Sequence, residues 1–263
     1  MLTSRLCSAV EFNEEWFVNY VEKFHCNLGY HRKLWEICAI AKAVDDYIIG
    51  ERVRAIGFGV GVEYLPSYFA NTFKQIIATD LPMESEKAKL WKDGLQHSNK
   101  LQEIFYEKVF KGDYNKFSDK VVFDGLDMNN IPEKYLDESF DLSWSSCTFE
   151  HLGSVKLGTD FIKNQMRCLK KGGYAIHTTE FNCDFSDTKT FQDGDTVLFN
   201  KSDIDKLIYE LRELGYCPLE PIYYLGDEPQ DKFIDIPPYS KNCHLKLKLA
   251  QYTTTSIILI VKK

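Results

Sequence analysis

The sequence predicts an α/β fold in which a mostly parallel sheet of seven strands carries helices on both faces. Short apolar runs typical of buried strands alternate with longer stretches whose apolar residues recur every three or four positions, as in helices. In residues 53–66 (VRAIGFGVGVEYLP) an apolar segment runs into alternating glycines, which is typical of a strand that turns sharply beneath a ligand. This alternation favours one parallel sheet wrapped by helices.

The boundaries of the expected elements follow from these runs. Strands are expected over residues 53–56, 76–78, 121–123, 140–144, 174–179, 217–225 and 253–261, and helices over 63–73, 158–169 and 200–215. Ser202 or Asp203 is the expected cap of the last helix, and KKGG at 170–173 is expected to end a helix and turn. The last two strands, joined by the proline-containing segment 226–241, suggest an antiparallel closing hairpin.

The amino-terminal 50 residues are expected to be helical, because apolar residues from Phe12 to Phe24 share one helix face. Residues 25–33 (HCNLGYHRK) mix aromatic rings, histidines and cations. We interpret them either as a solvated turn or as a cap over a ligand site, in which Arg32 meets a carboxylate while Tyr30 and His31 face a substrate. The chain is expected to be one domain, 1–263, made of a helical cap (1–50), a cofactor-binding core (51–182) and acceptor-side elements with the closing hairpin (183–263).

Composition excludes several classes of protein. A net charge of −7 disfavours a protein that mainly grips nucleic acid phosphates. The eight cysteines form no C-x-x-C pair, so neither a zinc site nor a redox motif is expected, and no metal is assigned. With no signal peptide and no apolar run near the ~18 residues of a membrane span, we expect a cytoplasmic protein with no membrane partner. The oligomeric state is left open.

The glycine pattern narrows the ligand. Gly57, Gly59 and Gly61 form G-x-G-x-G, whereas the dinucleotide fingerprint needs a glycine where this chain has Val62. The adjacent Glu63 would repel a pyrophosphate, but it suits a cofactor that carries an amino acid and a sulfonium cation.

Acidic residues follow the next two strands. Asp80 ends the second strand 23 residues after Gly57, close to the roughly 20 at which an acid binds ribose hydroxyls in a Rossmann-type unit. Asp127 and Met128 follow the third strand, where they either frame an adenine ring, by its amine and its face, or belong to a polar loop. Together these residues predict one nucleoside site at the carboxyl edge of the sheet.

These motifs resemble the class I S-adenosylmethionine-dependent methyltransferases over about residues 50–182. More narrowly, HRKLWE, SSCTFEHLGS, HTTEFN and HLKLKL…YTTTSI are similar to bacterial methyltransferases found near surface-polysaccharide (capsule) genes. The resemblance implies a Rossmann-like sheet with an antiparallel last strand and S-adenosylmethionine as cofactor. Cofactor contacts are implied for Arg32, Gly57, Gly59, Gly61, Glu63, Asp80, Leu81, Asp127, Met128 and Ser145, and acceptor contacts for Tyr30, His31, Cys147, Tyr239 and His244.

One position departs from that family. Its members often carry an acid two residues before the first glycine, where it positions the cofactor's amino group, and this chain has Ala55 there. Either Glu63 or a group from the capping segment is expected to take that role.

The implied reaction is methyl transfer to an oxygen, or less favourably a nitrogen, of a small acceptor. His151 and Glu180 follow the fourth and fifth strands and are the candidate bases, with His31 as a further candidate, although a lone histidine is also common in packing. His31, His151, His177 and His244, with Arg32 and Lys33, are expected at the pocket rim, which favours an anionic acceptor such as a sugar phosphate, a nucleotide-linked sugar or a phosphoryl capsule precursor.

Three other functions were weighed. A nicotinamide-dependent oxidoreductase is disfavoured by Val62, and a non-catalytic S-adenosylmethionine-binding module stays open. A nucleic-acid methyltransferase is disfavoured because SWSSC at 143–147 stands where an NPPY-type tetrad would follow the fourth strand.

Overall fold

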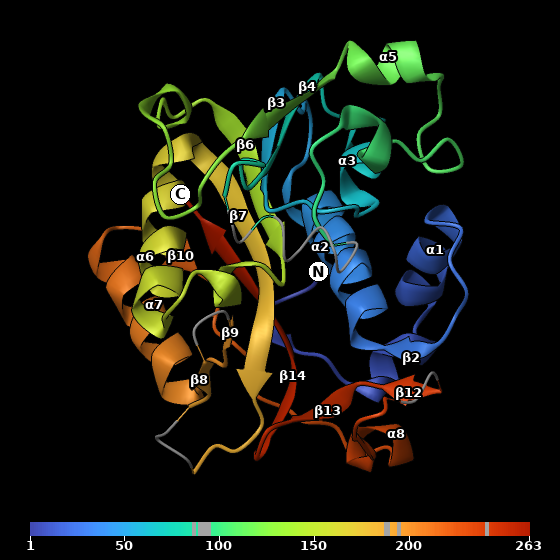
Figure 1. Ribbon diagram of the computed structural model, residues 1–263, viewed down its shortest axis with the longest axis vertical. Helices are drawn as coiled ribbons and strands as arrows, with labels where there is room; N and C mark the ends of the chain where they lie inside the picture. Colours follow the sequence, from blue (N-terminus) through green and yellow to red (C-terminus); the bar gives the residue numbers. More distant parts are fainter. Residues whose placement is uncertain (86–87, 89–95, 187–189, 194–195, 240–241) are drawn as a thin grey trace.

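A computed structural model describes residues 1–85, 88, 96–186, 190–193, 196–239 and 242–263. Its centre is a sheet whose parallel strands lie in the order β5-β4-β3-β6-β7, with β14 antiparallel beside β7 (Figure 1). These strands span Val121–Gly125 (β5), Gln75–Asp80 (β4), Arg54–Phe58 (β3), Phe140–Ser146 (β6), Leu169–Asn182 (β7) and Tyr252–Lys262 (β14). The predicted fold class, a Rossmann-like mixed sheet with helices around it, is confirmed.

The outer edge of β14 differs from the expectation. Three short strands share it end to end, each antiparallel to β14: β10 (Cys217–Pro218), β1 (Arg5–Leu6) and β13 (Lys246–Leu249). With β11 (Ile234–Asp235) parallel to β13, the described sheet has ten strands rather than seven. The strand expected at 217–225 is short because the amino-terminal segment takes its place: Ile222 donates to the Ser4 carbonyl at 2.9 Å, and Leu6 donates to the Ile222 carbonyl at 3.2 Å.

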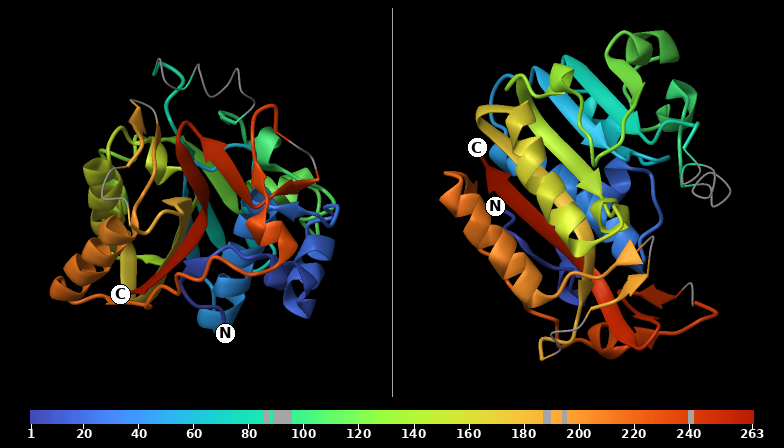
Figure 2. Two further views of the ribbon diagram at one scale, coloured as in Figure 1. Left: turned by 90° about the horizontal axis from the view of Figure 1, so that it is seen from below. Right: turned by 60° about the vertical axis from the view of Figure 1, so that its left-hand side comes forward.

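Helices cover both faces of the sheet (Figures 1 and 2). On one face lie α1, α2, α3 and α5, and on the other lie α6 and α7, each face with its own buried apolar cluster. Their bounds are Glu15–Lys23 (α1), Arg32–Tyr47 (α2), Leu65–Phe69 (α3), Tyr114–Ser118 (α5), Val155–Gln165 (α6) and Lys201–Glu213 (α7), while α8 (Pro229–Lys232) precedes β11. None of the described helices combines the length and apolar character that a membrane span requires.

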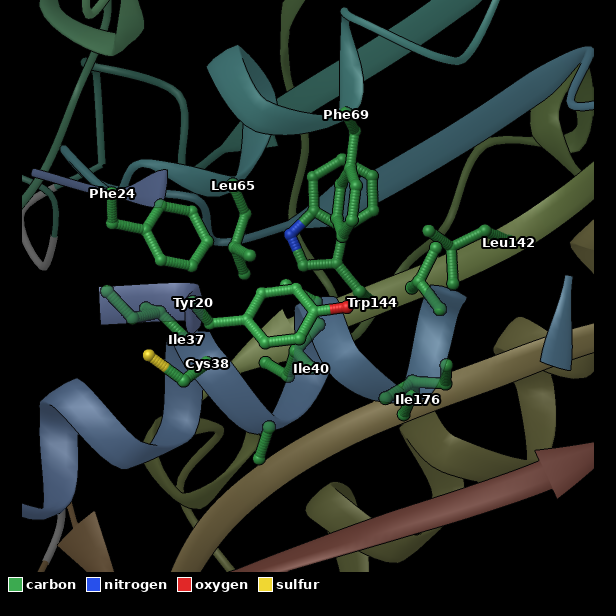
Figure 3. Close-up of a cluster of buried hydrophobic side chains, with 14 of the residues drawn as sticks. Tyr20, Phe24, Ile37, Cys38, Ile40, Leu65, Phe69, Leu142, Trp144 and Ile176 are labelled. Atoms are coloured by element: carbon green, nitrogen blue, oxygen red, sulfur yellow. The ribbon is translucent and has the colours of Figure 1, made fainter. Parts of the chain in front are cut away.

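Helix α2 is part of the protein core and does not only cover the ligand cleft. It contacts β6, β7 and β14, and its buried residues, from Trp35 to Val44, surround most of its circumference. A helix that is apolar nearly all round belongs in an interior. Figure 3 shows Ile37, Cys38 and Ile40 of this helix near Trp144 and Ile176 of the sheet. The amino-terminal turn of α2 is the part that reaches the ligand cleft described below.

Several local expectations were wrong. KKGG lies inside β7, where Gly172 has φ 83° and its N–H donates to the Lys263 carbonyl, so a bulge-like irregularity replaces the turn. Helix α7 is capped by Asn200 in a reciprocal capping box with Asp203, two residues before the earlier of the two expected caps, Ser202. The helix after the glycine turn is only five residues long, because the Asn71 side chain then bonds the carbonyls of Ser67 and Tyr68 at its end.

Candidate active site

A cleft of about 490 Å³ opens at the carboxyl ends of β3, β4, β5 and β6. This is the edge at which ligands bind to open α/β sheets. Of the residues singled out in the sequence, it is lined by Lys33, Gly59, Gly61, Glu63, Asp80, Leu81, Asp127, Met128, Cys147 and His151. The structure therefore gathers the expected residues from four neighbouring strand ends and adds one cation from α2.

Two of the three motif glycines shape the cleft floor. Gly59 and Gly61 have φ of 59° and 50°, and a Cβ would lie 2.1 Å from Thr148 Cγ2 and 2.5 Å from the Gln96 carbonyl oxygen, respectively. Both positions therefore require glycine. Gly57 lies within β3 and does not line the cleft; its missing Cβ makes room for the indole of Trp144, 2.3 Å away. The structure therefore does not support the expected contact of Gly57 with a cofactor.

Asp80 is held rigidly at the tip of β4. One carboxylate oxygen accepts from the Leu81 N–H at 2.8 Å, and the other accepts from the N–H groups of Gly61 at 3.1 Å and Ser98 at 3.2 Å. Burial raises the pKa of this carboxyl, against the lowering effects of His97 and the three backbone donors. Asp80 thus fixes the glycine turn relative to the next strand while still lining the cleft.

The segment after β5 adds an exposed acid and a buried thioether. The Asp127 carboxylate accepts from the Asn129 N–H at 2.9 Å, which closes a local turn. Met128 is buried, yet both residues line the cleft. This arrangement offers one carboxylate and one apolar contact side by side.

Glu63 and Lys33 bring opposite charges to the cleft. The Glu63 carboxylate accepts a 2.7 Å hydrogen bond from Trp144 Nε1. Burial raises its pKa to about 8, with a further contribution from Asp80. Lys33 Nζ lies 3.5 Å from Glu36 Oε2, and its side chain is half-exposed. Ala55, by contrast, is fully buried within β3 and offers no polar atom.

Arg32 does not line the cleft, contrary to its expected cofactor contact. It is 5% exposed and forms the centre of a buried group, the Arg32 cluster, with Glu36, Glu180, Ser256 and Cys147. One guanidinium nitrogen pairs with Glu180, and the other lies 3.2 Å from Glu36 Oε1 and 3.3 Å from Ser256 Oγ. Because these carboxylates already neutralise the guanidinium, it has no charge left to offer a ligand.

Glu180, like Arg32, is occupied by its partner in the Arg32 cluster. Burial alone would raise its pKa, but Arg32 and Lys33 outweigh burial and lower it. Glu180 therefore stays ionised in its ion pair, and it does not line the cleft. Its neighbour Glu150 is fully buried: one oxygen accepts from Thr179 Oγ1 at 2.9 Å, and the other has no hydrogen-bond partner among the described residues.

The four histidines expected at the rim do not meet. His151 lines the cleft, with Nδ1 3.2 Å from Thr196 Oγ1. His177 is fully buried, pairs with Ser145 Oγ at 2.8 Å, and has its pKa lowered to about 3 by burial. His177 is therefore not at the rim, and the structure does not support the expected cofactor contact of Ser145.

The remaining two histidines form a separate group outside the cleft lining. The short strands β2 (Tyr30–His31) and β12 (Cys243–His244) pair in parallel, and the rings of His31 and His244 stack at 4.7 Å. The Tyr239 ring meets His244 edge-on at 5.1 Å, and His244 Nδ1 lies 2.6 Å from an Asp235 carboxylate oxygen. Tyr30 packs against Phe12. None of these four residues lines the cleft, so the structure does not support their expected contact with a substrate.

Sequence reasoning missed several cleft residues. Thr148 and Leu126 line it directly after β6 and β5, and their position just past a predicted strand was the one available signal. Lys33 was read as part of the rim and not as a cofactor-side cation. Its role depends on the α2 terminus lying over the sheet edge, which no local pattern reveals.

Comparison with known proteins agrees with this geometry. Residues 56–177 match a family model described as a methyltransferase domain. These residues are a methyltransferase domain. Its cofactor is S-adenosylmethionine, and the expected enzyme class, an S-adenosylmethionine-dependent methyltransferase, is confirmed. Among curated proteins, none matches the chain.

Solved structures similar to this methyltransferase share little sequence with it. A putative methyltransferase from Bacillus halodurans is 14% identical, with 85% of this chain and 98% of that chain covered and a TM-score of 0.49. An S-adenosylmethionine-dependent methyltransferase from Clostridium acetobutylicum is 15% identical, with coverage of 94% and 97% and a TM-score of 0.47. The DhpI–SAH complex is 14% identical, with coverage of 97% and 90% and a TM-score of 0.45.

Proposed function

We propose that this methyltransferase methylates a hydroxyl oxygen of a small acceptor that binds beside His151. When bound, S-adenosylmethionine supplies an electrophilic methyl group on a sulfonium. The chain must then hold both reactants and accept one proton, since such a displacement depends chiefly on alignment. The observation that carries the proposal is that His151 supplies the imidazole in the described cleft lining, to which Cys147 and Thr148 also contribute.

The cleft residues fit the cofactor part by part. Asp80, Asp127 and Met128 line the cleft. In the proposed binding mode Asp80 accepts from ribose hydroxyls, while Asp127 and Met128 meet the amine and the face of adenine. Lys33 is the cation suited to the cofactor carboxylate. The glycine floor at Gly59 and Gly61 lets a ligand approach bare backbone.

His151 has the surroundings of a general base. Its side chain acts electrostatically to lower the pKa of Glu150 and Glu180, both of which are buried. An imidazole at this position in the cleft can accept the proton that leaves the acceptor hydroxyl. Glu180 itself is a poor base, because Arg32 keeps it ionised and occupied.

The charge of the acceptor can be inferred from the cationic side chains that line the cleft and are not already assigned to the cofactor. The anionic acceptor was inferred from six rim residues, of which Lys33 and His151 line the cleft. If Lys33 serves the cofactor carboxylate, the described lining keeps no lysine or arginine for a phosphate. We therefore propose a neutral hydroxyl acceptor, and a sugar unit of a surface polysaccharide, the context that the sequence resemblance suggests, is one of this kind.

A panel of paired acceptors tests this function. We expect turnover on neutral sugars to exceed turnover on the matching sugar phosphates, and His151→Gln to lower kcat by about 10²–10⁴-fold while S-adenosylhomocysteine affinity stays unchanged. Preference for the phosphorylated partner of each pair would contradict the neutral acceptor. Full kcat in His151→Gln would remove His151 as the base, and cofactor binding without turnover on any acceptor would favour the binding module.

A further inference from the structure

In the methyltransferases that this sequence resembles, an acid two residues before the first glycine often positions the cofactor's amino group. This chain has no charged residue at that position. Ala55 occupies it and is fully buried on the α2 side of β3. Glu63, eight residues later, is an acid that lines the cleft just beyond the glycine turn. An ammonium group needs an ionised partner, so the state of the Glu63 carboxyl decides whether it can serve.

The surroundings of the Glu63 carboxyl favour its neutral form. Asp80 and Glu36 raise its pKa together with burial, while Lys33 lowers it. Tyr106 also lies within electrostatic reach, and its hydroxyl donates to the Val62 carbonyl. Among the described residues, the one hydrogen bond to the Glu63 carboxylate comes from Trp144 Nε1, at 2.7 Å. This donor is therefore a principal local support for the ionised form.

Trp144 is built into the sheet in a way that fixes this donor. Its indole is fully buried on β6, edge-on to the Phe69 ring at 5.1 Å, and Figure 3 shows the two rings in contact above α2. The ring lies over Gly57 of β3, where any Cβ would come within 2.3 Å of it. A ring so confined has little freedom to move its N–H away from Glu63.

We propose that Trp144 is a positioning residue that holds Glu63 as the anionic partner of the cofactor's ammonium group, in place of the acid missing at Ala55. Gly57 then serves the site indirectly, by admitting the indole. The inference concerns the cofactor end of the cleft and is independent of the acceptor proposed above.

Calorimetric binding of S-adenosylhomocysteine, which retains the amino group, tests the proposal without turnover. Trp144→Phe keeps most of the ring and removes the N–H, and we expect it to weaken binding about tenfold at pH 7, since a hydrogen bond to a charged group is lost. Glu63→Gln should weaken binding at least as much. The double variant should bind no more weakly than Glu63→Gln alone, because Trp144 acts through Glu63.

The pH dependence separates positioning from a general packing defect. Wild-type affinity should rise between pH 6.5 and 8 as Glu63 ionises, the rise should move to higher pH in Trp144→Phe, and it should vanish in Glu63→Gln. A packing defect would lower affinity equally at every pH. Additive losses in the double variant, or unchanged affinity in Glu63→Gln, would overturn the proposal. If Trp144→Phe does not fold, the Glu63→Gln measurement still tests whether Glu63 binds the ammonium group, on which the role of Trp144 depends.

Discussion

Two adjacent cations in the first turn of α2, Arg32 and Lys33, illustrate two ways to place charge near a cleft. Lys33 is half-exposed, makes one 3.5 Å ion pair with Glu36 and lines the cleft. Arg32, one residue earlier, is buried and paired with carboxylates from its own helix and from β7. Neighbours in sequence thus differ completely in what they can do: the lysine is available to a ligand, whereas the arginine joins the two halves of the chain.

This contrast shows that a cation beside a ligand site need not bind the ligand. The Arg32 cluster draws on residues as far apart as Arg32 and Ser256, and both also contact Glu36. A buried charge network of this kind tolerates the loss of a member poorly, because the remaining charges stay desolvated. The predictions that follow separate the two roles, beginning with the largest effect.

Arg32→Ala should lower the free energy of unfolding by about 3–5 kcal/mol, because Glu36 and Glu180 would remain buried without their partner. Lys33→Ala is the matched control on the same turn and should change stability by less than about 1 kcal/mol. Urea unfolding of both variants measures the difference. Equal losses would show that the two cations are alike after all.

Asp80→Ala should weaken S-adenosylhomocysteine binding about tenfold to a hundredfold, through the loss of a charge-assisted contact to ribose. It should also lower stability, because three backbone N–H groups lose their acceptor. Asp127→Ala, at an exposed turn, should weaken binding with a stability change within about 0.5 kcal/mol. Calorimetry and urea unfolding on each variant give both quantities, and unchanged affinity in Asp80→Ala would refute the ribose contact.

Lys33→Ala should weaken S-adenosylhomocysteine binding by about fivefold at low salt, since it removes a half-exposed partner of the cofactor carboxylate. The difference from wild type should shrink as ionic strength rises, because exposed charges are screened. Titrations at two salt concentrations measure this. A salt-independent difference would mean that Lys33 acts through packing instead.

The last prediction concerns the change of folding stability with pH. The pKa of Glu63 in the folded protein is raised to about 8, so its contribution favours folding below the usual carboxyl pKa and is lost as pH rises toward 8. Glu63→Gln lacks this titration, so wild type should lose stability relative to the variant between pH 5 and 8. Urea unfolding at both pH values provides the check, and parallel behaviour of the two proteins would contradict it.

The sheet could be predicted from sequence because its signals are local. Apolar runs marked β3, β4, β6, β7 and β14, and the glycines marked the turn after β3. The edge beyond β14 could not be predicted, since β1 pairs there across most of the chain and β10 has too few residues to leave a pattern. The bulge at Gly172 could not be predicted because a pair of glycines indicates a turn whether or not a strand continues through it.

In the candidate site, too, residues with a local sequence signal could be predicted, and residues whose role depends on distant partners could not. Asp80 and Asp127 were placed correctly in the cleft because each directly follows a strand of a parallel sheet. His177 was misplaced because a sequence does not say which side of a strand faces the core: its ring points into the apolar layer between Phe149 and Phe161. Arg32 was misassigned because its partner Glu180 lies 148 residues away and gives no local signal.

The placement of β14 has a consequence for the order in which the protein is synthesised. This strand lies inside the sheet, between β7 and the three short strands on its far side, yet it follows all of those strands in the sequence and therefore leaves the ribosome after them. Until then a nascent chain presents the open edge of β7 and the unpaired segment that becomes β1. Open strand edges invite pairing with other chains. Shielding of this edge by a chaperone during translation would therefore bear directly on the yield of folded enzyme.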